Sequence, residues 1–421
     1  FSSSSPAISM ISNAAPVSIQ PPPIHHSSFL RSIPFLPISF TFLIFLNFLC
    51  LTSFFSIHCA ILESMTDGKN HIFLETVTHK DVGVIAPAIL KERITTMPGF
   101  TTHYIMGMKA YNDMPSNTLK HIISKYRWLY QLGLQGPDMF FYYIPALRHR
   151  DYRNVASYMH EHHVQEFFEC YLKETAKIPF RQQREQAIAY FCGYLCHYIG
   201  DSICHPYVYG RIQYDIDNPS MAHHGKHAEL ENDIDALLLR RYKKKKPSEF
   251  NQAATICLNG LETQFISRHL AKCINDAYYP ITYRNNFQIS PRMVQRSILA
   301  LRFGCRTLSD PSGRKKTGLQ FMESLLRRHH VASRKLVTDQ VSDTRWSLNL
   351  DHEIWCNPWK KQMASTQSFP DLFYQCLTKC RTVYYLFNQL ITSGAAPDEL
   401  DLTPLLHELG SYSFHSGLPV D

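Results

Sequence analysis

This 421-residue chain contains two pairs of potential metal ligands, and the two members of each pair are four positions apart in the sequence. His197 and Asp201 form the first pair, and His227 and Glu231 form the second. Residues four apart on an α-helix share one face, about 6 Å apart at Cβ, so an imidazole and a carboxylate there can hold one divalent cation. A hydrogen-bonded surface pair is the alternative for either pair alone. Their repetition within 35 residues favours a metal site.

The segment around the first pair is apolar, and it predicts the environment of these ligands. Burying the ionised carboxylate of Asp201 there would cost free energy unless it is paired or bound to a metal. Pro206 disfavours helical geometry at the residue before it. We therefore expect His205 to lie at a helix end and to turn toward a different ion.

Gly225 predicts a helix boundary just before the second pair. We accordingly expect His223 and His224 to lie in a loop and not to act as ligands. The nearby carboxylates are expected either on a solvated face or as partners that orient a ligand histidine; they are Glu229, Asp233 and Asp235.

Helical periodicity dominates from residue 97 onward, with little strand alternation. The pattern predicts helices over 103–112, 116–130, 155–175, 182–204, 226–243, 250–275, 291–307, 315–338, 369–392 and 401–408. The sequence thus predicts an all-α fold with a single multi-helix domain. Residues 97–250 form its metal-site core, and 251–421 form the helical C-terminal part of the same domain.

Residues 1–96 differ in composition from the rest, being rich in Ser and Pro and then apolar from 29 to 62. One interpretation is a membrane anchor through 29–62, since about 20 apolar residues cross a bilayer. The other is a non-native upstream extension, largely disordered, with translation starting at Met97. We expect a cytoplasmic protein in the second case and a membrane-anchored one in the first.

Charge and cysteine content narrow the class further. The net charge of +8 fits a phosphate-bearing or anionic partner as well as ordinary solubility. The basic run at 240–246 is expected to be a solvated helix end that complements the helix dipole. Twelve cysteines without a paired CxxC framework favour a reducing compartment over a disulfide scaffold.

The chain resembles the bacterial zinc-dependent phospholipase C family over nearly all of 97–421. The stretches that carry the resemblance are Met97-Pro98-Gly99-Phe100-Thr101-Thr102-His103-Tyr104, Gly133-Leu134-Gln135-Gly136-Pro137-Asp138, Met159-His160, the segment from His197 to His205-Pro206, His227 to Glu231, Trp355-Cys356-Asn357-Pro358-Trp359 and Ser416-Gly417-Leu418-Pro419.

The resemblance implies an all-α fold with two to three Zn²⁺ ions. One ion would be held by Asp138, His160, His197 and Asp201, and a second by His205, His227 and Glu231. His103 would hold a third, with Asp201 bridging to the first. Asp138 would also be catalytic, positioning or deprotonating a water molecule.

The activity that the resemblance implies is phosphodiester hydrolysis of the phospholipase C type. A metal-activated water would attack phosphorus and release a phosphorylated head group and an alcohol such as diacylglycerol. Phospholipid or another phosphodiester is the expected partner, with peripheral membrane contact and no specific nucleic acid. The alternatives are a zinc-dependent single-strand nuclease of similar fold and a non-catalytic metal-binding or lipid-binding protein. Ligation by His and carboxylates without Cys also allows manganese or iron.

Overall fold

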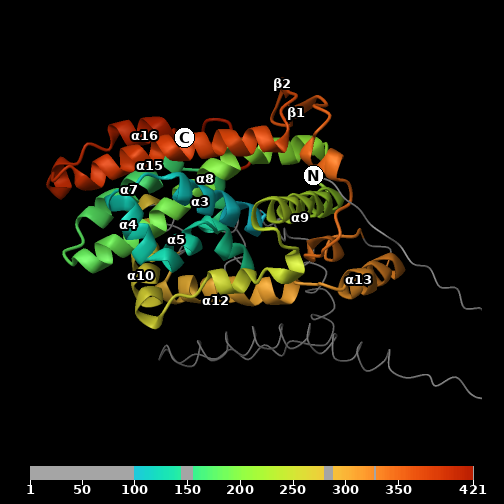
Figure 1. Ribbon diagram of the computed structural model, residues 1–421, viewed down its shortest axis with the longest axis horizontal. Coiled ribbons are helices and arrows are strands. Elements are labelled where there is room, and N and C mark those ends of the chain that lie inside the picture. Colours follow the sequence, from blue (N-terminus) through green and yellow to red (C-terminus); the bar gives the residue numbers. More distant parts are fainter. Residues whose placement is uncertain (1–98, 144–154, 279–287, 327–328, 421) are drawn as a thin grey trace, which may run out of the picture. The chain divides into compact units, whose positions relative to one another are not determined.

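The computed structural model describes residues 99–143, 155–278, 288–326 and 329–420, which all belong to one unit of the chain (Figure 1). The expectations for residues 1–96, including the anchor at 29–62 and the start at Met97, lie outside the described residues. Within the described ranges, no helix combines the length and the apolar character needed to cross a bilayer.

The described fold is all-α, as predicted, with one small antiparallel hairpin in which Trp355 pairs with Ser365. The elements in chain order are α3 (Phe100–Asp113), α4 (Thr118–Lys125), α5 (Arg127–Gly133), η1 (Gly136–Tyr142), α6 (Val155–Glu161), α7 (Val164–Ala176), α8 (Arg181–Arg211), α9 (Met221–Lys243), η3 (Pro247–Glu249), η4 (Gln252–Thr255), α10 (Gly260–Ala277), α12 (Pro291–Leu308), α13 (Arg314–Leu325), η5 (Ser333–Lys335), α14 (Thr344–Leu348), β1 (Trp355–Asn357), β2 (Lys360–Ser365), α15 (Phe369–Thr392), η6 (Pro397–Glu399) and α16 (Thr403–Leu409).

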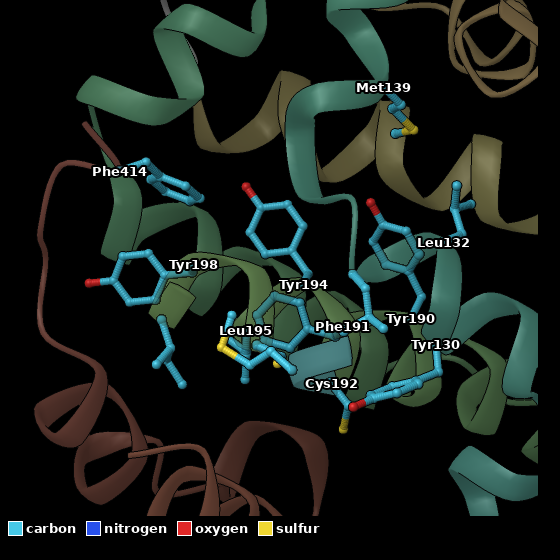
Figure 2. Packing of buried hydrophobic residues seen from close by; sticks show 14 of the residues in the cluster. Tyr130, Leu132, Met139, Tyr190, Phe191, Cys192, Tyr194, Leu195, Tyr198 and Phe414 are labelled. Carbon is cyan, nitrogen blue, oxygen red and sulfur yellow. The ribbon is translucent and has the colours of Figure 1, made fainter. Parts of the chain in front are cut away.

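Helix α8 is the centre of the core, because it is buried on every side from Glu185 to Asp201. A helix that is apolar all round is typical of a core position. Figure 2 shows its aromatic side chains between α5 and the C-terminal segment. The hydroxyl of Tyr198 donates to the carbonyl oxygens of Leu409 and Gly410 at 3.2 and 3.1 Å, so even this buried polar group is satisfied.

Two glycines allow α5 and α8 to pack backbone against backbone. A Cβ atom on Gly133 would lie 2.0 Å from the carbonyl oxygen of Tyr190, and one on Gly193 would lie 2.1 Å from that of Tyr130. No side chain fits at either place. This contact holds α5, and the loop that follows it, directly against the ligand-bearing helix.

The expected end of a helix at His205 is wrong, because α8 continues through Pro206 to Arg211. Proline lacks an N–H, so it leaves the Ser202 carbonyl without its helical partner. The C-terminal turn covers this position: Gly417, at φ +62°, lies so close that a Cβ atom there would be 2.4 Å from the Ser202 oxygen. Tertiary packing therefore stabilises the helix where the local rule predicts its end.

The expected boundary at Gly225 is also wrong. Helix α9 begins at Met221, and the Ser220 side chain caps it by accepting from the backbone N–H of His223. His223 and His224 are therefore helical and not in a loop. Gly225 serves packing instead, since a Cβ atom there would lie 2.5 Å from the carbonyl oxygen of His330.

Four long predicted helices are interrupted in the structure. The range 155–175 divides into α6 and α7, with His163 between them in the left-handed region at φ +49°. Tyr126 leaves the helical region and separates α4 from α5 within 116–130. The range 250–275 opens with a 3-10 turn, and its helix starts only after the capping box of Asn259 and Glu262. In 315–338, α13 ends at Leu325, and Glu323 accepts from the backbone N–H groups of Val331 and Ala332.

The close contact of α5 and α8 predicts a large cost for Gly193→Ala. The added methyl group meets backbone atoms that cannot rotate away, so we expect a loss of about 1–3 kcal/mol in the free energy of unfolding. Gly318→Ala on α13 is the matched control, because its Cβ atom meets open space. Alanine should stabilise that helix by up to about 1 kcal/mol. Thermal unfolding measures both, and equal melting temperatures would contradict the packing described.

Candidate metal centre

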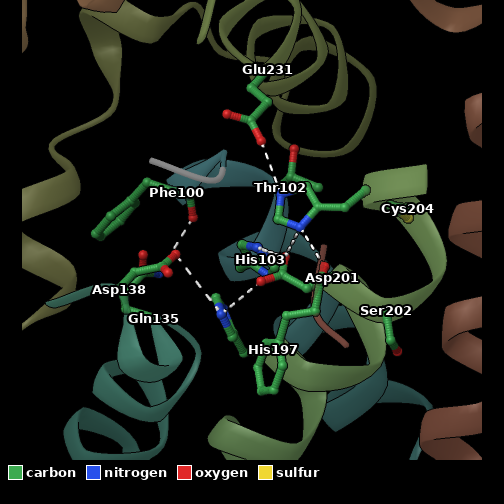
Figure 3. Close-up of polar contacts among 12 residues, drawn as sticks. Phe100, Thr102, His103, Gln135, Asp138, His197, Asp201, Ser202, Cys204 and Glu231 are labelled. Carbon is green, nitrogen blue, oxygen red and sulfur yellow. Dashed lines mark hydrogen bonds and ion pairs between the residues drawn. The ribbon is translucent and has the colours of Figure 1, made fainter. Parts of the chain in front are cut away.

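The first ligand group consists of Asp138, His160, His197 and Asp201, all of them buried. They come from three elements: η1 carries Asp138, α6 carries His160, and α8 carries the other two. One ligand atom from each lies within 4.8 Å of all the others. Figure 3 shows the carboxylates of Asp138 and Asp201 both directed at Nε2 of His197, which lies 3.8 Å from Oδ2 of Asp138 and 3.0 Å from Oδ2 of Asp201.

Backbone carbonyls fix the orientation of both imidazoles in this group. Nδ1–H of His160 donates to the carbonyl oxygen of Ala156 at 2.6 Å, and Nδ1–H of His197 donates to that of Leu134 at 3.2 Å. Each ring therefore turns Nε2 toward the carboxylates, which is the arrangement usual for metal-ligating histidines. Gly136, at φ +48°, leaves room for it, since a Cβ atom there would lie 2.1 Å from Cδ2 of His197.

The contacts inside the group fit a bound cation better than hydrogen bonds. Nε2 of His197 lies 3.0 Å from Oδ2 of Asp201, and Nε2 of His160 lies 3.1 Å from Oδ1 of Asp138. None of these four atoms makes a hydrogen bond to any described residue. Burial lowers the pKa of His197, so its Nε2 lone pair faces a carboxylate oxygen.

Two lone pairs at this distance repel each other unless a cation lies between them. Ligand atoms around tetrahedral zinc are separated by roughly 3.3 Å. Two imidazole nitrogens and two carboxylate oxygens are also a suitable donor set for this ion. The residues of the first ligand group therefore fit zinc.

The second ligand group consists of His205, His227 and Glu231. Oε1 of Glu231 lies 3.2 Å from Nε2 of His205 and 2.8 Å from Nε2 of His227. Nδ1–H of His205 donates to the carbonyl oxygen of Phe414 at 2.7 Å, which directs Nε2 toward Glu231. Three protein ligands leave one position of a tetrahedral zinc open, as catalytic sites require.

Charge couples the members of the second ligand group. Burial lowers the pKa of His205, but Asp201 and Glu231 outweigh it and raise the pKa to about 10. Burial also raises the pKa of Glu231, but His227 and His205 outweigh that effect and hold the pKa below its usual value. Without a metal, this group is therefore an ion pair of protonated His205 with Glu231.

Asp201 links the two groups and also pairs with His103. Its Oδ2 faces His197, while its Oδ1 lies 3.0 Å from Nε2 of His103 and 3.6 Å from Nδ1 of His205. Burial lowers the pKa of His103, but Asp201 raises it to about 9. Among the described residues, His103 belongs to neither ligand group. The structure thus brings His103 to Asp201, and the described part of the chain adds no further ligand for a third ion.

Asp235 positions the helix that carries His103. Its carboxylate accepts the backbone N–H groups of Thr101 and Thr102 at 2.9 and 2.7 Å, which are orphan donors of the first turn of α3. Burial raises the pKa of Asp235 to about 6. Asp233 is buried as well and accepts from Ser347. The expectation of a solvated face is therefore wrong for both aspartates, while Glu229 pairs with Arg334 at 3.0 Å.

Sequence reasoning missed the C-terminal segment as part of the site. Besides orienting His205, Phe414 donates its backbone N–H to the carbonyl oxygen of His160 at 2.9 Å. The ring of His415 stacks on that of His160, with centroids 4.9 Å apart. Both residues directly precede the Ser416-Gly417-Leu418-Pro419 motif, which was the available signal. The C-terminal segment therefore bridges the two ligand groups.

Residues 102–279 match the family model described as zinc dependent phospholipase C, as the resemblance predicted. The matched segment contains all eight candidate site residues. No curated protein and no solved structure matches the chain.

The two ligand groups predict two separable zinc ions in each chain. His197→Ala should remove the ion of the first group and Glu231→Ala that of the second, because each substitution takes a ligand from only one group. His121→Ala, at an exposed position on α4, is the control and should keep both. Elemental analysis of the purified chains measures this. Less than one zinc in the unsubstituted chain would contradict the assignment.

The raised pKa of His205 predicts that zinc loading releases a proton. At pH 6.5–8 the metal-free His205, with a pKa of about 10, is protonated, and the ion can take Nε2 only after that proton leaves. Affinity should therefore rise about tenfold per pH unit for each proton displaced. Calorimetry in buffers of different ionisation enthalpy measures the proton count. A pH-independent affinity would show that His205 is not a ligand.

Proposed function

We propose that this protein is a phospholipase C-type, zinc-dependent phosphodiester hydrolase that acts on phospholipid. The observation that carries the proposal is the pair of buried ligand groups inside the matched segment, with Asp201 of the first group 3.6 Å from His205 of the second. Clustered carboxylates and imidazoles with an open coordination position are suited to in-line displacement at phosphorus. The match of residues 102–279 to the zinc dependent phospholipase C model supports phospholipid as the substrate.

The bound ions and Asp138 would contribute different tasks to this reaction. Zinc bound there would supply Lewis-acid charge to the phosphodiester oxygens and make a water molecule acidic enough to attack near neutral pH. Asp138 belongs to the first group, and we assign its carboxylate the further task of accepting the proton of that water. The new bond joins the water oxygen to phosphorus, the bond from phosphorus to the glycerol oxygen breaks, and that oxygen takes up a proton.

A single-strand nuclease is the second candidate, and one observation favours it. The rings of Tyr214 and Trp359 are stacked, with centroids 5.8 Å apart, and both are partly exposed. Tyr209 joins them to the second ligand group, with ring centroids 4.9 Å from Trp359 and 4.5 Å from His227. Aromatic platforms of this kind can stack on unpaired bases.

Asp138→Asn should distinguish the two hydrolase candidates from a non-catalytic metal-binding or lipid-binding protein. The amide cannot accept a proton from water, so we expect turnover to fall by about 10²–10⁴-fold. Release of phosphorylated head group from a panel of short-chain phospholipids is measured beside cleavage of single-stranded DNA, each with chelator and after zinc is restored. His121→Ala is the control with unchanged turnover. If only DNA is cleaved, the protein is the nuclease of the second candidate. If neither substrate is cleaved, the proposal that the protein is a hydrolase is refuted.

A further inference from the structure

Helix α12 presents an outward stripe that combines basic and large apolar side chains. Arg292, Leu299, Phe303 and Arg306 follow one another at intervals of seven, four and three residues, so they share one face of the helix. All four are exposed, Leu299 at 59% and Phe303 at 51%. The opposite face carries the buried side chains of Val294, Ile298 and Leu301.

Helix α13 repeats the pattern and buries no residue at all. Arg314, Phe321 and Leu325 lie at intervals of seven and four residues on its outward face. Phe321 is 69% exposed, Leu325 is 66% exposed, and Leu326 at the end of the helix is 57% exposed. Figure 1 shows α13 beyond the end of α12. We refer to the two stripes together as the α12–α13 surface.

The α12–α13 surface is basic as well as apolar. Residues 291–326 contain seven Lys and Arg but only Asp310 and Glu323 as acidic residues. Both carboxylates are used internally: Asp310 accepts the backbone N–H of Lys316 at 2.8 Å, and Glu323 accepts those of Val331 and Ala332. The charge directed outward is therefore positive.

Both helices are attached to elements that carry the ligand groups. Helix α12 packs against η1, where Gly304 lies so close that a Cβ atom on it would be 2.3 Å from the ring of Tyr142. Helix α13 is joined to α9 through Lys316, whose Nζ lies 3.6 Å from Glu229. The α12–α13 surface thus lies on helices that contact the elements of Asp138 and of Glu231.

We propose that the α12–α13 surface docks the protein on an anionic phospholipid bilayer. Phenylalanine and leucine beside arginine and lysine are the composition of helices that lie in the membrane interface, and basic residues near an anionic leaflet are attracted to its negative surface potential. The inference rests on the proposed function only in that the bilayer would supply the substrate. Exposed leucines are not needed on a surface that binds nucleic acid, so this composition favours a bilayer as the partner.

A local fluorescence probe tests the docking in the full-length chain. Phe321→Trp places the reporter on the α12–α13 surface, and Tyr374→Trp, at a position on α15 that is exposed to 68%, is the matched control. The four natural tryptophans contribute equally to both variants. With vesicles of brominated phosphatidylcholine and phosphatidylserine, we expect loss of emission in Phe321→Trp but not in Tyr374→Trp. The loss should disappear at high salt and without phosphatidylserine.

The second measurement is the rate of lipid hydrolysis. Phe303→Ser combined with Phe321→Ser should lower hydrolysis of vesicle lipid by about tenfold or more, while zinc content and hydrolysis of monomeric short-chain lipid stay unchanged. The docking would be overturned if brominated vesicles changed the emission of both tryptophan variants equally. It would also be overturned if the unsubstituted chain were a dimer that the serine variant converts to a monomer. Quenching at position 321 without hydrolysis of any lipid would support docking while refuting the proposed function.

Discussion

A carboxylate can stay ionised inside an apolar helical core only when positive charge or hydrogen-bond donors surround it, and Asp201 is in this situation. It is 2% exposed on the most deeply buried helix, where desolvation alone would cost several kcal/mol. Burial raises its pKa, but the neighbouring imidazoles outweigh this and hold the pKa well below its usual range; His205 and His103, whose own pKa values are raised, supply the positive charge. The fold must therefore bring α3 against α8, and it must keep α8 helical past Pro206. The interactions that make this burial tolerable are the same ones that assemble the two ligand groups.

Three distant parts of the backbone orient the imidazoles. The carbonyl oxygens of Leu134, Ala156 and Phe414 each accept one Nδ1–H, which leaves Nε2 of His197, His160 and His205 directed inward. Two of these carbonyls lie far along the chain from the histidine they hold, so they reach it only in the folded protein. The glycine contacts between α5 and α8 place Leu134, and the turn at Gly417 places Phe414. Loop and C-terminal segments are thus as necessary to the site as the helices.

Local spacing was sufficient to predict the pairs at 197 and 201 and at 227 and 231, because helical periodicity alone brings residues four apart together. The all-α fold followed from the same periodicity. The continuation of α8 through Pro206 could not be predicted, since the turn at Gly417 that accompanies it lies more than 200 residues away. Ser220 was a readable helix cap that would have placed the start of α9 correctly. His162 and His163 follow His160 within three residues, and which of the three faces Asp138 depends on packing that no local pattern contains.

The central claim is that the two buried groups are metal sites and not a network of ion pairs. Anomalous diffraction from crystals of the protein, recorded on both sides of the zinc absorption edge, tests it directly. The account predicts two anomalous peaks, one among Asp138, His160, His197 and Asp201 and one among His205, His227 and Glu231. The absence of any peak from zinc-supplemented crystals, or a peak outside these residues, would contradict it.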